Sequence, residues 1–438
     1  MAQVPGLLLN ELNRPDATPP TTSPVLHILR HFGFAMYPDW PESDADLVPL
    51  PRCHGPKLKP FDFQGPQKIE FLDYIGEGLH AHVFKIKIMG KIYALKLFRF
   101  VYDGDWMSPD YEGLYATASL EAMSAFYEYS EPFSSECRAF GRLQEAGHEE
   151  LAVRCFGYLL LDEQHERAIM DQFSHHRIRF NGNVDGPLAS DELRSRFLGK
   201  SGRLPPIRGI VKEFGHLPQA LRTRDARRIL QHVTQLHQLG IIYVDVADRQ
   251  LINHKICDFS TAITTPHYVT NPELNPLIAP EWIPAMEFET FQFSISDYWS
   301  FDDMVQLWNA EHKDQKSKLA VYAFPGSRGY PTKYNLRNTP SRERVFSFVD
   351  PRLYDWRRPA ASPGNKATRA SDRQRKRKMG SRRADPKTRV RLDAKPPKWY
   401  LDCNDEVTAN LKLGTAGRGW TTSLSWEFRD GRIFPRKK

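Results

Sequence analysis

Residues 69–100 read IEFLDYIGEGLHAHVFKIKIMGKIYALKLFRF, and this stretch decides how the rest of the chain is interpreted. Apolar side chains alternate with polar ones in three runs, at 71–75, 81–89 and 91–100, with glycines at both breaks. A period of two residues bounded by glycine is typical of β-strands joined by tight turns. The stretch therefore predicts a three-stranded antiparallel meander, with the last two strands joined at Gly90.

The first turn of this meander contains Gly76 and Gly78. Because glycine has no side chain, these positions let the backbone approach phosphate groups, and Val83 on the next strand could cover a purine. The third glycine expected of a phosphate-binding turn is Ala81 here. A plain hairpin turn with two glycines has the same composition, so it stays open as the alternative.

The third strand carries Ala94 and Lys96, which alternation puts on the same face, below the glycine-containing turn. A lysine there could reach nucleotide phosphates, while a small alanine leaves room for a base. Such a lysine needs a carboxylate partner inside a cleft, and Glu136 on a predicted helix can supply one. The long gap between them predicts an insertion at about 101–131. An isolated strand lysine is otherwise a solvated side chain.

Further strands are predicted at 153–161 and 209–214, and a helix from Asp225 to Leu239 with Gly240 as its end. The strand at 209–214 contains Lys212, followed by Glu213. A long cationic side chain at this place would narrow or fill a base pocket. The alternative is that it points to solvent.

Residues 241–252, IIYVDVADRQLI, follow this helix directly. In one class of phosphoryl-transfer enzymes an aspartate accepts the substrate's proton, a lysine neutralises the transferred group and an asparagine holds magnesium. Asp245 can fill the first role, but Ala247 stands in the lysine position and Gln250 in the asparagine position. The extra methylene of glutamine displaces its oxygen from a tight octahedral site. Asp258, in the run ICDFS at 256–260, can still bind a metal.

In this order, the landmarks resemble the protein kinase superfamily over residues 69 to about 305. The resemblance implies an α+β, two-lobed fold, with an antiparallel small lobe at 67–215 and a helical, shortened large lobe at 216–355. It implies ATP and Mg²⁺ as the cofactors, if any are used. It assigns catalytic roles to Lys96, Glu136 and a degenerate Asp245, metal binding to Asp258 and Gln250, and nucleotide binding to Gly76, Gly78, Val83, Ala94, Lys96 and Glu213.

The runs at 74–85, 136–143 and 256–262 more closely resemble a fungal family of kinetochore subunits, the Fta-two type of the Sim-four complex. That resemblance covers most of residues 55–355. It implies a nuclear, centromeric location and other kinetochore subunits as partners. None of the motifs themselves contains kinetochore chemistry.

The ends of the chain differ in composition from its centre. Residues 1–66 hold 12 of the 33 prolines, which predicts a mostly disordered arm. Residues 357–398 carry 16 Lys or Arg against three Asp, a net charge of +13. The net charge of the whole chain is +8, so the remainder carries −5. A basic disordered segment at 356–398 and a carboxyl-terminal tail at 399–438, with an unplaced strand pair, are therefore predicted.

The basic segment predicts binding to an import receptor, with weak DNA contact as the rarer meaning of such a cluster. Its basic cluster consists of Arg373, Arg375, Lys376, Arg377, Lys378, Arg382 and Arg383. No apolar run is long enough to span a bilayer, so a soluble intracellular protein with no membrane contact is expected. The five cysteines form no C-x-x-C pair, which favours reduced thiols.

Three functions follow from these features. The first is a catalytically impaired, kinase-like scaffold, because lost electrostatic groups in the catalytic loop cost phosphoryl transfer heavily. The second is a divergent but active ATP-dependent kinase that relies on Lys96, Glu136, Asp245 and Asp258. The third is a chromatin or nucleic-acid binder that acts through its basic segment.

Overall fold

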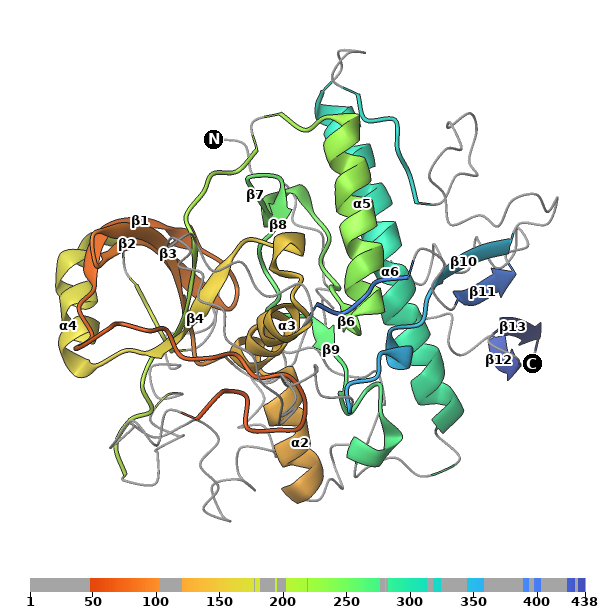
Figure 1. Ribbon diagram of the computed structural model, residues 1–438, viewed down its shortest axis with the longest axis horizontal. Helices are drawn as coiled ribbons and strands as arrows, with labels where there is room; N and C mark the ends of the chain where they lie inside the picture. Colours follow the sequence, from red (N-terminus) through yellow and green to blue (C-terminus); the bar gives the residue numbers. More distant parts are fainter. Residues whose placement is uncertain are drawn as a thin grey trace, which may run out of the picture.

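The computed structural model describes residues 48–101, 120–176, 178–181, 194, 202–218, 220–275, 280, 283–312, 318–323, 345–357, 389–393, 398–402, 424–429 and 432–437. Over these residues the chain is an α+β structure, with an antiparallel sheet at one end, helices beyond it and a small second sheet at the other end (Figure 1). Residues 1–47 of the predicted arm and all seven residues of the basic cluster lie outside the described residues.

The first sheet has five strands, each antiparallel to its neighbours, in the order β1-β2-β3-β5-β4. The strands are β1 (Glu70–Glu77), β2 (Ala81–Ile88), β3 (Lys91–Phe98), β4 (Cys155–Leu160) and β5 (Arg208–Glu213). The predicted meander is confirmed, since β1, β2 and β3 follow one another in both the chain and the sheet, and Gly90 has a φ of 76° at the second turn. Because β5 pairs with β3, a distant part of the chain lies beside Lys96.

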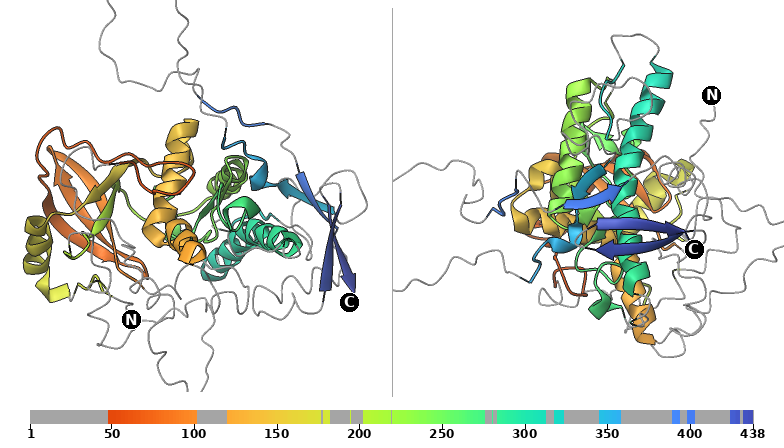
Figure 2. Two further views of the ribbon diagram at one scale, coloured as in Figure 1. Left: turned by 90° about the horizontal axis from the view of Figure 1, so that it is seen from below. Right: turned by 90° about the vertical axis from the view of Figure 1, so that its right-hand side faces the viewer.

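Three helices accompany this sheet: α2 (Leu120–Ser130), α3 (Pro132–Ala146) and α4 (Glu163–Gln172). Helix α3 begins after Glu131, whose carboxylate accepts a hydrogen bond from the backbone of Ser134 at 3.0 Å. It ends at Gly147, which has a left-handed φ of 71°. These two caps satisfy terminal backbone groups and fix the length of the helix. Helix α3 lies between the sheet and the remaining helices (Figure 2).

Two longer helices, α5 (Thr223–Gln238) and α6 (Ile283–Glu311), pack against each other beyond α3. Helix α5 buries Ile229, Val233 and Leu236 at helical spacing, as predicted from the sequence, and Gly240 follows with a φ of 72°. Two short strand pairs come between α5 and α6. They are β6 (Ile241–Ile242) with β9 (Ile263–Thr264), and β7 (Leu251–Ile252) with β8 (Lys255–Ile256). The short 3₁₀ turns are η4 (Glu149–Leu151), η5 (Ser174–His176), η8 (Asp248–Gln250), η9 (Pro272–Leu274) and η11 (Pro351–Leu353).

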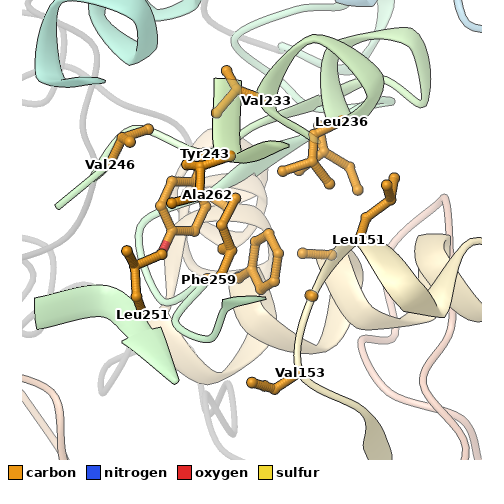
Figure 3. Close-up of a cluster of buried hydrophobic side chains, with 14 of the residues drawn as sticks. Leu151, Val153, Val233, Leu236, Tyr243, Val246, Leu251, Phe259 and Ala262 are labelled. Carbon is orange, nitrogen blue, oxygen red and sulfur yellow. The ribbon is translucent and has the colours of Figure 1, made fainter. Parts of the chain in front are cut away.

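One apolar core extends from α3 through α5 to α6, and a second fills the space between the sheet and α4. At the centre of the first core, Tyr243 and Phe259 lie side by side, with ring centroids 5.1 Å apart (Figure 3). Phe259 also packs against Phe140 of α3, at a centroid distance of 5.1 Å. The core therefore fixes the two loops that precede β7 and follow β8.

The packed body begins before residue 67, so the predicted arm at 1–66 is too long at its carboxyl end. Leu58 is fully buried, and residues 57–61 run directly against α3 and β4. A Cβ at Gly141 would lie 2.7 Å from the carbonyl carbon of Lys57, and one at Gly157 would lie 2.7 Å from the carbonyl oxygen of Lys59. This irregular segment has no helical or strand period, which is why its packing was not predicted.

The second sheet has the strand order β10-β11-β13-β12. Its strands are β10 (Val345–Val349), β11 (Lys398–Asp402), β12 (Leu424–Arg429) and β13 (Arg432–Lys437). The predicted strand pair of the tail corresponds to β12 and β13, while the non-local pairing of β10 with β11 was not predicted. The end of the segment predicted to be disordered is also packed, since the Val390 amide donates to the Ala146 carbonyl at 3.0 Å.

No helix within the described ranges is both long and apolar enough to cross a membrane. Cys53, Cys137, Cys155 and Cys257 are free thiols, as predicted, and Cys403 lies outside the described residues.

Candidate functional site

Four charged side chains from four segments meet between the sheet and α3. Lys96 of β3 donates to Glu136 Oε2 of α3 at 2.7 Å and to Asp258 Oδ1, after β8, also at 2.7 Å. The Glu136 side chain is fully buried and that of Lys96 is 6% exposed, whereas that of Asp258 is 25% exposed. The carboxylate partner predicted for Lys96 is therefore in place.

Lys212 of β5 is the fourth member. Its ammonium donates to Glu136 Oε1 at 2.7 Å and to the carbonyl of Cys257 at 2.9 Å. Its side chain is 9% exposed, so the alternative that it points to solvent is wrong. We refer to Lys96, Glu136, Lys212 and Asp258 together as the cleft network; its two positive and two negative charges cancel.

The cleft network also shifts the pKa values of Asp258 and Lys96. Burial by itself would raise the pKa of Asp258, but the ammonium groups of Lys96 and then Lys212 outweigh it and hold that pKa well below its usual range. Burial would likewise lower the pKa of Lys96, and the carboxylates of Asp258 and Glu136 raise it above its ordinary value instead. Both groups are therefore charged at neutral pH, as a buried ion pair requires.

The glycine-containing turn between β1 and β2 lies against the segment that carries Asp258. The His80 ring Nδ1 and the Ser260 hydroxyl are 3.1 Å apart, and His80 is buried. The Ser260 amide also donates to Asp258 Oδ1 at 2.9 Å. Gly76, which was predicted to lie in the turn, belongs to β1 and has a φ of 156°, while a Cβ at Gly76 or Gly78 would meet nothing within 4 Å. The turn is thus joined to the cleft by its histidine.

The remaining residues predicted to bind a nucleotide lie on the same sheet. Val83 pairs with Lys96 across β2 and β3, and Ala94 pairs with Lys212 across β3 and β5. Glu213 ends β5 and forms an ion pair with Lys255 at 3.5 Å, with its side chain 39% exposed. Val83 and Ala94 thus flank the lysines of the cleft network, whereas the Glu213 side chain points away from it to Lys255.

Asp245 lies on the loop between β6 and η8, and two residues of η8 donate hydrogen bonds to both of its carboxylate oxygens. Arg249 donates to Oδ1 at 2.6 Å and the Gln250 amide donates to Oδ2 at 2.7 Å. The side chains of Asp245 and Arg249 are 36% and 58% exposed. Asp245 and Gln250 therefore bind each other, and the structure records no hydrogen bond from either to the cleft network.

A buried aspartate on α6 fixes the start of this loop. Asp297 accepts hydrogen bonds from the amide of Tyr243 at 2.8 Å and from that of Val244 at 2.5 Å. Its Oδ2 also lies 2.7 Å from the His237 ring of α5. Val244 has a φ of 73°, a conformation that β-branched residues avoid. The buried carboxylate compensates for this strain by accepting both amides.

The residues that the sequence predicted to bind ATP and Mg²⁺ have partners within the protein. Lys96, which would bind phosphate, already donates to two carboxylates, and Gln250, which would bind magnesium, donates to Asp245. Across the described part of the chain, no three His, Cys, Asp or Glu side chains gather so that they could hold a metal ion.

Sequence reasoning missed the link between His80 and Ser260 and left the direction of Lys212 open. Both depend on non-local packing, since His80 and Ser260 are 180 residues apart and Lys212 and Glu136 are 76 apart. Strand alternation places Lys212 on the same face as Ile210, a buried position, and this was the one available signal.

Comparison with known proteins finds one family. Residues 47–263 match the sequence model of the family described as kinetochore Sim4 complex subunit FTA2, a span of just under half of the chain. This span contains the whole five-stranded sheet, the cleft network and the Asp245 loop. None of the curated proteins matches the chain. Over residues 47–263 the chain is therefore similar to the kinetochore Sim4 complex subunits of the FTA2 family.

Proposed function

We propose that this chain is a non-catalytic scaffold with a kinase-like, two-lobed fold, and that it serves as a subunit of a fungal kinetochore complex. The match of residues 47–263 to a family of kinetochore subunits supports the role, the nuclear location at centromeres and other kinetochore subunits as partners. The element order supports the fold: a five-stranded antiparallel sheet, a helix that carries Glu136, and then the helical part with α5 and α6.

The observation that supports the non-catalytic part is the engagement of Asp245. A general base needs a carboxylate oxygen within reach of the substrate's hydroxyl group. Here Arg249 and Gln250 hold the two oxygens at 2.6 and 2.7 Å. Gln250, which would hold magnesium, therefore binds Asp245, which would act as the base. Ala247 supplies no charge for the transferred group, and such electrostatic groups provide most of the rate of phosphoryl transfer.

A divergent active kinase is the second candidate, because one observation favours it. The Lys96–Glu136 ion pair that catalysis requires is formed, with Asp258 2.7 Å from the same ammonium. The Asp245–Arg249 contact is at the surface, where a pair of this kind is worth about 1 kcal/mol or less, so a substrate could displace it. The two candidates differ in what Asp245→Ala does to function.

The experiment is a replacement of the chromosomal copy by tagged wild-type and Asp245→Ala versions in the cell that encodes the protein. Chromatin immunoprecipitation then measures how much centromeric DNA each version recovers, and plating assays measure chromosome loss. We expect equal centromeric enrichment and equal, low chromosome loss for both versions. If the wild-type chain shows no centromeric enrichment, the kinetochore role is wrong. If only Asp245→Ala loses chromosomes, the scaffold role is wrong.

A further inference from the structure

Lys212 connects three parts of the structure near Lys96. The position is on β5, directly opposite Ala94 of β3, so the lysine stem starts on the sheet face that carries Lys96. Its ammonium ends between Glu136 of α3 and the carbonyl of Cys257. One side chain thus joins the sheet, the helix and the loop that carries Asp258.

The ammonium group of Lys212 and the charges near it are paired with one another. Each oxygen of Glu136 accepts one ammonium at 2.7 Å, and Lys96 also binds Asp258. The ring of Phe140 lies 5.8 Å from the Lys212 ammonium and closes its apolar side. A buried charge of this kind is tolerated only when its partners satisfy it. The Glu136 carboxylate therefore needs no ligand to complete it.

The space beside Ala94 is also occupied, by the stem of Lys212. The small Ala94 side chain, which was expected to leave room for a base, lies beside the stem of Lys212 instead. A purine entering there would have to displace the ammonium, and that would leave Glu136 with one cation in place of two. The buried Glu136 carboxylate would then be under-compensated, which makes entry unfavourable.

We propose that Lys212 fills the space between the sheet, α3 and the Asp258 loop, and so excludes purine nucleotides. This inference rests on the proposed kinase-like fold and deepens it by naming the residue that sets ligand specificity. Lys212 is a specificity-determining residue here and takes no part in any reaction.

The test is nucleotide binding by the purified full-length chain and its Lys212 variants. Lys212→Met removes the charge and keeps most of the bulk, while Lys212→Ala removes both. Lys87→Met is the matched control, because Lys87 lies on β2 of the same sheet, in an exposed ion pair with Glu70. Each protein is titrated with ATP, with and without Mg²⁺, by calorimetry and by thermal melting.

We expect no binding and no change in melting temperature for the wild type and for Lys87→Met. Lys212→Ala should bind ATP with an affinity at least roughly tenfold above the wild-type limit, and its melting temperature should rise with ATP. Binding by Lys212→Met as well assigns the exclusion to the charge, and binding by Lys212→Ala alone assigns it to the bulk. The double variant Lys212→Ala/Lys96→Met should lose the gained binding, because the phosphates would need Lys96.

Two results overturn the inference. The first is ATP binding by the wild type with an affinity like that of Lys212→Ala. The second is no binding by any Lys212 variant that melts cooperatively; Lys212→Gln, which keeps a hydrogen-bond donor, replaces a variant that does not fold. ATP binding by the wild type without turnover would overturn the role of Lys212 and leave the scaffold function standing. A wild-type chain that is not enriched at centromeres would overturn the kinetochore role and leave the role of Lys212 standing.

Discussion

Glu136 is the residue on which the cleft network depends most, and Glu136→Gln tests this. The substitution keeps the shape of the side chain but removes its negative charge. Two ammonium groups, of Lys96 and Lys212, would then share the single carboxylate of Asp258 in a buried site. The amide nitrogen of glutamine would also face one ammonium as a second donor. One of the two ammonium groups is therefore left without a negatively charged partner.

The magnitude follows from burial. The Glu136 side chain is fully buried, and the two lysine side chains are 6% and 9% exposed. Removing one partner of a buried ion pair costs about 3–5 kcal/mol, because the remaining charge stays desolvated. For a chain of 438 residues that corresponds to a fall in melting temperature of about 3–5 °C. We therefore expect Glu136→Gln to lower the free energy of unfolding by about 3–5 kcal/mol.

The assay is urea unfolding followed by circular dichroism, with the midpoint and slope compared between variants. Glu70→Gln is the control, because Glu70 pairs with Lys87 at 3.0 Å with side chains 57% and 41% exposed. An exposed pair of this kind contributes about 1 kcal/mol or less. If Glu136→Gln costs no more than Glu70→Gln, Glu136 does not hold two buried cations and the reasoning about the cleft network fails.

Four further outcomes are expected. Asp297→Ala should lower the free energy of unfolding by at least about 3 kcal/mol, since two buried amides lose their acceptor; a urea midpoint within error of wild type would contradict this. Gly141→Ala should cost about 2 kcal/mol or more in the same assay, because its Cβ would meet backbone 2.7 Å away, and a neutral result would show that residues 57–58 are not packed there. Burial lowers the pKa of His82 to about 4 and that of His267 well below its ordinary value. Their unfolded forms take up protons first, so stability should fall as the pH drops below about 6.5, and equal midpoints at about pH 7.5 and pH 5 would exclude it. Replacing the seven basic residues of 373–383 with glutamine should disperse a tagged chain from the nucleus; unchanged nuclear enrichment would exclude the import signal, and a salt-sensitive loss of DNA retention would favour DNA binding.

The sequence predicts the local parts of this fold and the local part of the site. The meander and α5 follow from periods of two and of three to four residues, and Lys96 was correctly expected to need Glu136. The partners of Lys212 could not be predicted, because they depend on which strand lies beside β3. Sequence periodicity contains no information about pairing between strands that are far apart in the chain.

Two other features were hidden for the same physical reason. Residues 57–61 pack through close backbone approaches at Gly141 and Gly157, which leave no periodic pattern in an irregular segment. The contact of Gln250 with Asp245 depends on side-chain rotamers within one loop, and the sequence favours neither this arrangement nor a metal-binding one.

The central claim is that the Asp245 loop and the cleft network form a site that does not transfer phosphate. The most direct measurement incubates the purified wild-type chain and its Asp245→Ala variant with γ-labelled ATP and Mg²⁺, and follows labelled protein and released phosphate. The account predicts the same background level for both proteins, because Arg249 and Gln250 occupy the oxygens of Asp245. Turnover by the wild type that Asp245→Ala abolishes would contradict it.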